Sequence, residues 1–283
     1  MNSANDSNLN SDPNPIPMSG LPLIRVTILG CGSSGGVPLP TGNWGQCDPN
    51  NPRNRRRRAS ILLEIGDKTI LVDTGPDLRE QLLTYGPPQG LDAVILTHHH
   101  ADHIHGIDDV RHYVYQRRAA LPMILLPETE AHVRENLRYI FEGFAWYPPL
   151  FEPQVVEPSS GVIDVEIAGF PFQLWRQPHG RVETIGLRIG GFAYSTDCVD
   201  LPATILDQLR DWRLEVWMAD AARGEPHPAH AHLEMTKGWM DHARPKRGLI
   251  THMSEWLDYA QTLAATQDFV EPAYDGLVLE IGG

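Results

Sequence analysis

The chain has 283 residues, enough for one large domain or two small ones, and its 41% hydrophobic content suffices for a substantial core. The formal net charge of −13 argues against an extensive nucleic-acid-binding surface, because phosphate contacts need clustered Lys and Arg. The three cysteines, Cys31, Cys47 and Cys198, cannot all pair, and so few in this length indicate a reducing compartment. No apolar run approaches the roughly 20 residues of a membrane helix, so we expect a soluble cytoplasmic protein that does not bind membranes.

Residues 1–20 are polar and lack the basic start and apolar run of a signal peptide, so they predict a disordered tail. Short β-branched runs then predict strands at residues 24–29, 60–65, 69–72, 93–97, 123–126, 162–167, 172–176, 184–189, 192–195, 215–219, 248–251 and 277–281. Helical spacing of apolar residues predicts helices at 77–85, 107–114, 128–141, 202–212, 234–243 and 254–266.

Strands come in pairs early and in a cluster mid-chain, which does not fit a simple strand–helix alternation. Two mixed sheets packed face to face, with helices outside, fit better. No linker divides residues 21–283, which we expect to form a single domain. Residues 142–160 are rich in proline and aromatic residues and are interpreted as a packed surface loop, with a lid or pocket wall as the alternative.

The densest motif is LTHHHADHIHG, which places five histidines and one aspartate in eleven residues after a predicted buried strand. Imidazole and carboxylate groups are suitable ligands for divalent first-row metals. In the pattern His98-x-His100-x-Asp102-His103, the first two histidines could face one ion while Asp102 and His103 face a second. His99 and His105 fall outside this pattern and are expected to be loop or surface histidines.

Two ions need more ligands than one loop supplies, and we expect them at other strand ends. His179, Asp197 and His252 each follow such a predicted strand. Asp197 is predicted to bridge the ions, because one carboxylate can contact both. The first ion would then be held by His98, His100, His179 and Asp197, and the second by Asp102, His103, His252 and Asp197.

Asp73 ends a further strand in ILVDTG. It is predicted to accept a proton from a ligand imidazole and so fix its tautomer. The alternative is a helix N-cap before Pro76.

This HxHxDH pattern, preceded by an aspartate at a strand end and followed by isolated His, Asp and His, resembles the metallo-β-lactamase superfamily from Ile24 to about His252. The resemblance implies a four-layer αββα sandwich of two mixed sheets flanked by helices. It also implies a metal-dependent hydrolase with two divalent ions, zinc or manganese, with iron as a further option.

Three stretches, GCGSSGGVP, RNRRRRASILLE and DHIHGIDDVR, resemble the cyclic-phosphodiesterase branch, which includes the phosphoribosyl 1,2-cyclic phosphate phosphodiesterase of phosphonate breakdown. This resemblance implies hydrolysis of a small, cyclic phosphodiester, such as a phosphoribosyl cyclic phosphate or a nucleotide-like substrate, by a water held between the ions. Asp102 and Asp197 would orient that water. The partner is then a small phosphorylated substrate rather than extended nucleic acid, and a homodimer is left open.

In that branch a further histidine lies near the substrate phosphate, and by position it matches His232, which would protonate the leaving oxygen. His230 and His227 are close alternatives, and a histidine that caps the following helix is another. Further substrate contacts are predicted at Ser33, Ser34, Arg57 and His230. The arginine run from Arg53 to Arg58 could bind a substrate phosphate or be mostly solvated.

The chain departs from the branch in one place. Typical members carry a cysteine cluster that binds a structural zinc, whereas TGNWGQCDPNNP retains only Cys47. A four-ligand thiolate site is not available from these residues, so we predict no third metal. The loop would instead be stabilised by Trp44 and the prolines.

Other functions remain as alternatives. A transfer-RNA-processing endonuclease shares the metal motif but needs an extended basic arm, which this acidic chain does not show. A thioesterase or glyoxalase-type hydrolase usually has a double glycine where this chain reads DHIHG. A non-catalytic accessory protein would be expected to lose ligands, yet every expected position is filled.

Overall fold

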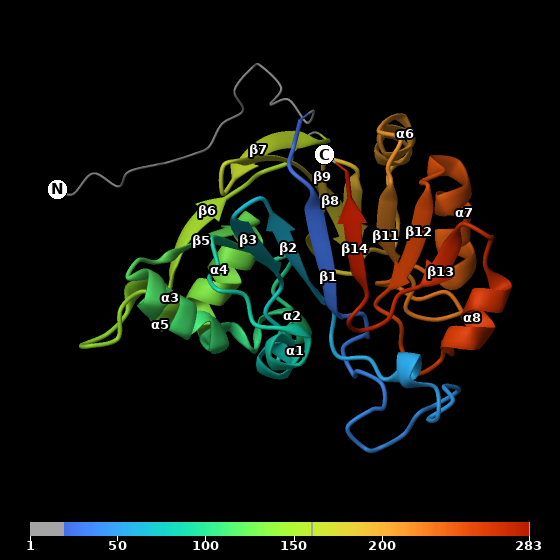
Figure 1. Ribbon diagram of the computed structural model, residues 1–283, viewed down its shortest axis with the longest axis horizontal. Coiled ribbons are helices and arrows are strands. Elements are labelled where there is room, and N and C mark those ends of the chain that lie inside the picture. The colour runs from blue at the N-terminus through green and yellow to red at the C-terminus, as the bar shows by residue number, and fades with distance from the viewer. Residues whose placement is uncertain (1–19, 160, 283) are drawn as a thin grey trace.

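The computed structural model describes residues 20–159 and 161–282, so the predicted tail, apart from Gly20, lies outside the described residues. Two seven-stranded sheets form the centre of the molecule (Figure 1). The first has the order β14-β1-β2-β3-β4-β5-β6, with bounds Val278–Ile281, Ile24–Gly30, Ser60–Ile65, Lys68–Val72, Ala93–Ile95, Leu121–Leu125 and Phe151–Val155. The second has the order β13-β12-β11-β10-β9-β8-β7, with bounds Val270–Pro272, Arg247–Thr251, Val216–Asp220, Phe192–Ser195, Val182–Ile189, Phe170–His179 and Ile163–Ile167.

Helices flank the two sheets on their outer sides (Figure 1). Beside the first sheet lie α1 to α5, with bounds Leu78–Tyr85, Ala101–Ile104, Arg111–Arg117, Pro127–Asn136 and Tyr139–Glu142. Beside the second lie α6 to α8, with bounds Ala203–Asp211, Leu233–Ala243 and Tyr259–Ala265. Short 3-10 turns occur at Pro52–Asn54 and Ile107–Val110. None of the helices in the described part of the chain is long and apolar enough to cross a membrane.

The apolar pattern of the strands explains the layers. In β2, Ile61, Leu63 and Ile65 belong to the larger core cluster, whereas Leu62 faces the cluster that packs against α1 to α5. This alternation is expected because successive side chains of a strand point to opposite faces. Both faces of the first sheet are thus buried, one against the second sheet and one against helices. The predicted αββα sandwich is confirmed.

Each sheet combines antiparallel and parallel pairs. β3, β4, β5 and β6 pair in parallel, and so do β10, β11, β12 and β13. The carboxyl ends of parallel neighbours meet at one edge of a sheet, where binding sites are commonly built. The loops that follow β3, β4, β10, β11 and β12 therefore gather the chemistry described below.

Three predicted segments differ from the structure. The interpretation of residues 142–160 as a loop is wrong in part, because Phe151–Val155 pairs with β5 as an edge strand, where Pro153 can be tolerated. The predicted helix 128–141 is interrupted at Leu137, whose φ of −130° is not helical. The predicted helix 254–266 begins only at Tyr259, because Asp258 takes the N-cap position and accepts a hydrogen bond from the Gln261 backbone N–H.

Candidate metal centre

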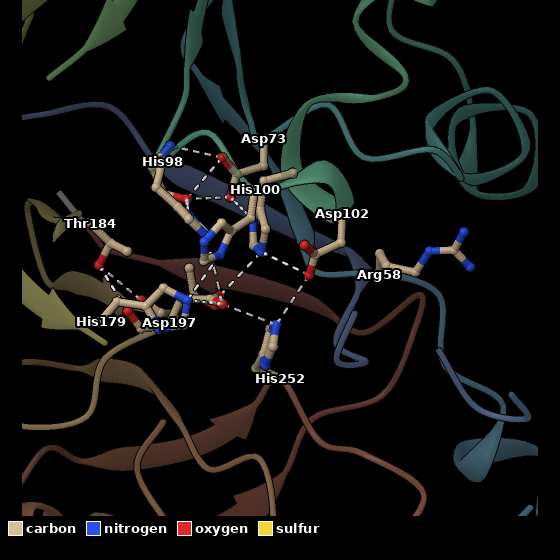
Figure 2. A network of polar contacts seen from close by, with 12 residues as sticks. Arg58, Asp73, His98, His100, Asp102, His179, Thr184, Asp197 and His252 are labelled. Carbon is tan, nitrogen blue, oxygen red and sulfur yellow. Dashed lines mark hydrogen bonds and ion pairs between the residues drawn. The ribbon is translucent and has the colours of Figure 1, made fainter. Parts of the chain in front are cut away.

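Five strand ends bring the predicted ligands together in one buried cluster (Figure 2). Asp73 directly follows β3, and the histidine-rich loop follows β4 and forms α2. His179 ends β8, Asp197 follows β10 and His252 follows β12. The first sheet therefore supplies one wall of the cluster and the second sheet supplies the other.

The side chains fall into two sets whose ligand atoms lie within 4.8 Å of one another. The first set is His98, His100 and His179, and the second is Asp102, His103, Asp197 and His252. Asp197 lies between the sets: its Oδ1 is 3.7 Å from His179 Nε2 and its Oδ2 is 3.3 Å from His103 Nε2. This is the placement that a bridging carboxylate requires.

Hydrogen bonds behind the cluster fix how its imidazoles are presented. His103 Nδ1 donates to Asp73 Oδ2 at 2.7 Å, and the Thr97 hydroxyl donates to the same carboxylate. That hydroxyl lies 3.1 Å from His98 Nδ1, from which it can accept. Both rings then direct Nε2 and its lone pair into the cluster. One buried carboxylate thus positions two histidines of the cluster. Asp77, and not Asp73, occupies the N-cap position of α1.

The same arrangement recurs at His179, whose Nδ1 lies 2.6 Å from the Ala229 carbonyl oxygen and donates to it. Among the described residues, the buried Nε2 atoms of His98, His103 and His252 make no hydrogen bond of good geometry, and all three face the Asp197 carboxylate, at 3.9, 3.3 and 3.2 Å. Buried polar atoms are otherwise almost always satisfied. Nitrogen lone pairs and carboxylates that converge in this way fit divalent cations, which prefer this donor set.

Proton equilibria in the cluster follow from its burial and its charges. Burial lowers the pKa of His98 well below its usual value. Burial also opposes protonation of His103, yet the carboxylates of Asp197, Asp102 and Asp73 raise its pKa well above the usual value. Burial also opposes protonation of His252, but the carboxylates of Asp197, Asp102 and Asp220 together raise its pKa to about 9. Without a cation the acids and imidazoles therefore pair with each other, and a metal must displace protons from them.

The backbone is locally strained at three residues whose side chains point into the cluster. Asp73, Asp197 and His252 adopt left-handed φ values of 64°, 52° and 57°, which non-glycine residues rarely do. Close packing supports the turn, because a Cβ on Gly75 would collide with the Asp102 carbonyl oxygen and one on Gly106 with the Gly75 carbonyl. Both glycines let the segment after β3 lie directly on α2.

Asp220, at the end of β11, is a residue of the site that the sequence reasoning missed. It is fully buried, and its Oδ2 accepts from the Cys198 backbone N–H and from His230 Nδ1, both at 3.0 Å. The signal was present in VWMAD, an aspartate that ends a buried strand as Asp73 does in ILVD.

His230, and not His232, is the histidine of its segment that joins the cluster. His230 forms ligand-distance groups with Asp197 and His179 and with Asp220 and His252. His232 starts α7 at the N-cap position, without a side-chain capping bond, and belongs to no such group within the described residues. The His227 ring contacts that of His230 in a tilted arrangement, with ring centroids 5.1 Å apart.

The structure places some of the predicted substrate-binding residues beside the cluster and others away from it. Ser33 lies beside the cluster, because its backbone N–H donates to the carbonyl of Met253, which follows His252. Ser34 is exposed on the same turn. Arg57 is not brought to the cluster: its guanidinium contacts Thr84 Oγ1 and the ring of Tyr85.

The other residues of interest outside the ligand sets have different partners. Arg56 is buried against Cys47 and the Ser254 carbonyl, and Arg58, drawn beside Asp102 in Figure 2, pairs with Asp77. His99 stacks on His132 at 4.3 Å, and His105 is exposed. These arginines therefore have mainly local roles in the fold, while the ligand loop keeps His99 and His105 outside the cluster.

Comparisons with known proteins agree with this geometry. A family model called Beta-lactamase superfamily domain matches residues 68–253. A crystal structure of a new diphosphatase from the PhnP family is 32% identical with a TM-score of 0.81, covering 92% of this chain and 98% of that chain.

Two curated relatives match over different lengths. An octanoyltransferase of Porphyromonas gingivalis (strain ATCC BAA-308 / W83) is 30% identical over 259 residues, which is 90% of this chain and 51% of that protein. Ribonuclease Z of Bradyrhizobium sp. (strain ORS 278) is 37% identical over 70 residues, 24% of this chain and 23% of the enzyme. The chain thus spans about half the length of the first and a quarter of the second.

The matched segment includes Asp73, the histidine-rich loop and all the distant ligand positions through His252. The fold, the cluster and the full-length similarity to a PhnP-family enzyme lead to one conclusion. The chain belongs to the metallo-β-lactamase superfamily and is a metal-dependent hydrolase.

Proposed function

We propose that this chain is a two-metal phosphodiesterase that hydrolyses a small, cyclic phosphodiester. The observation that carries the proposal is the pair of ligand sets with Asp197 between them, and the Asp220–His230 pair beside them. Ions held by His98, His100, His179 and Asp197, and by Asp102, His103, His252 and Asp197, would be zinc, manganese or iron. When bound, two such ions supply the positive charge that stabilises the attacking and leaving oxygens of a phosphodiester.

The chain's own residues have distinct roles in this reaction. Asp102 is the most exposed carboxylate of the cluster, at 11% of its side chain, and is placed to orient the attacking water together with Asp197. His230 is 15% exposed and replaces His232 as the proposed proton donor to the leaving oxygen. Its Nδ1 donates to Asp220, which fixes the orientation of the ring and leaves Nε2 for the substrate.

A small substrate is favoured over RNA by two observations. The similarity to the PhnP-family diphosphatase extends over nearly the whole of both chains, whereas the match to ribonuclease Z covers about a quarter of each. The arginines of the run are also engaged with protein groups: Arg57, away from the cluster, contacts Thr84, and Arg58 pairs with Asp77. A substrate that carries an octanoyl group is the second candidate, because 90% of the chain matches about half of a protein named octanoyltransferase.

A substrate panel tests the proposal. Metal-free protein is reloaded with Zn²⁺, Mn²⁺ or Fe²⁺ and assayed on a ribose cyclic phosphate, 2′,3′-cyclic AMP, ADP, an octanoyl thioester and a transfer-RNA precursor. We expect the cyclic phosphodiesters to be turned over with the highest kcat/KM. Preferred hydrolysis of ADP, the thioester or the RNA precursor would contradict the proposal and identify the competing reaction.

A further inference from the structure

A cavity of about 380 Å³ lies beside the metal centre and is not used by the reaction described above. It is lined by Gln46, Arg223, Gly224, Glu225 and Trp256. Its volume is in the range of small-molecule sites.

Backbone contacts place this cavity at the edge that carries the metal centre. Ser254, two residues after His252, donates from its N–H to the Ala222 carbonyl at 3.0 Å, and Ala222 lies two residues after Asp220. Arg223 pairs with His232 in a parallel bridge, next to His230. The Gln46 N–H donates to the Glu255 carbonyl at 2.8 Å, so the segment that contains Gln46 lies against the segment that contains Trp256. Arg223 and Trp256 thus lie three and four residues after Asp220 and His252, on the segments that leave this edge of the second sheet.

The lining combines a flat aromatic face with fixed polar groups. Trp256 is 51% exposed and lines the cavity with its indole ring. The guanidinium of Arg223 is held by the carbonyls of Glu225 and Pro226, at 3.2 and 2.7 Å. Arg223 and Glu225 bring opposite charges, and the Gln46 amide offers a donor and an acceptor.

A planar heteroaromatic ring matches this lining, because it stacks on an indole and carries both donors and acceptors at its edge. We propose that the cavity binds the nucleobase of a nucleotide substrate, with Trp256 as the stacking platform. The inference rests on the proposed function, since the phosphodiester of that substrate would lie at the metal centre. It narrows the substrate class to nucleotides.

Calorimetric titration of the metal-loaded protein with AMP and with ribose 5-phosphate tests this site without turnover. Stacking on one aromatic side chain corresponds to about 10- to 100-fold in affinity, so Trp256→Ala should weaken AMP binding by that factor. Trp256→Phe should recover most of it, and ribose 5-phosphate binding should not change. Trp146→Ala is the matched control, because Trp146 is 82% exposed in the segment between α5 and β6 and should leave AMP affinity unaltered.

Kinetics give a second readout. With 2′,3′-cyclic AMP, Trp256→Ala should raise KM by a similar factor and retain kcat, while KM for a ribose cyclic phosphate stays constant. Unchanged AMP affinity in Trp256→Ala, or equal weakening of AMP and ribose 5-phosphate, would overturn the inference. Trp256-dependent AMP binding without hydrolysis of any phosphodiester would support the cavity and refute the proposed function.

Discussion

Replacing Asp73 by asparagine tests how the cluster is held in place. Asp73 is fully buried and accepts from His103 Nδ1, from the Thr97 backbone N–H at 2.8 Å and from the Thr97 hydroxyl. An amide of the same shape removes the charge and offers one acceptor oxygen in place of two. His103, and His98 through Thr97, would then lose the orientation that points Nε2 into the cluster.

The magnitude follows from the lost interaction. A hydrogen bond to a buried charged group contributes about 1.5–3 kcal/mol, which corresponds to about 10- to 100-fold in metal affinity. We expect Asp73→Asn to bind metal that much more weakly, measured by competition of the metal-free protein with a chelator of known affinity. Circular dichroism should show that the variant remains folded.

Asp258→Asn is the matched control for this experiment. Asp258 is also a buried carboxylate that accepts backbone hydrogen bonds, but it caps α8 and does not contact the cluster. It should lose stability, by about 1–3 kcal/mol, because an amide nitrogen in place of Oδ2 cannot accept from Asn54 Nδ2 and the Asp48 backbone N–H, while the metal affinity should stay unchanged. A folded Asp73→Asn protein with the affinity of the wild type would refute the role assigned to Asp73.

Three further predictions follow from the site. Asp102→Ala should lose one metal and nearly all turnover with the fold retained, checked by elemental analysis and assay; near-normal activity would contradict the two-metal reaction. His230→Ala should keep both metals and lose about 10²–10⁴-fold in turnover, less with a nitrophenolate leaving group, whereas His232→Ala should stay within a few-fold; the reverse order would restore the role predicted for His232. Burial and Asp197 set the His252 pKa at about 9 in the metal-free protein, above the unfolded value of about 6.5, so up to about 3 kcal/mol of stability is present below pH 6.5 and lost as the pH rises through 9. Thermal unfolding of chelated protein between pH 6 and 10 checks this, and a Tm independent of pH would be inconsistent with it.

Much of the ligand cluster could be predicted because its signal is local. The HxHxDH loop follows a buried strand, and His179, Asp197 and His252 each end or follow another, so strand ends together with the resemblance to the superfamily indicated them. Asp73 was found in the same way. Asp220 satisfies the same rule, and it was missed because no metal set required it.

The choice between His230 and His232 could not be made from the sequence. The two histidines alternate in AHAHL, and the turn before α7 decides which of them faces the cluster. The position of the Arg57 side chain could not be predicted from the sequence either. The arginine run suggested a phosphate contact there, but the guanidinium lies over the ring of Tyr85, which is distant in sequence. β6 and β13 were missed because their residues, FEPQV and VEP, contain prolines and lack a clear alternation. Only pairing with a neighbouring strand makes them strands.

Titration of activity against bound metal tests the central claim most directly. Metal-free protein receives increasing Mn²⁺ or Zn²⁺, and hydrolysis of a cyclic phosphodiester is followed together with metal bound per chain. We predict that turnover rises until two equivalents are bound and then stays constant, with no third tightly bound ion. Full activity at one equivalent, a third tightly bound zinc near Cys47, or no phosphodiester hydrolysis at two equivalents would contradict the account.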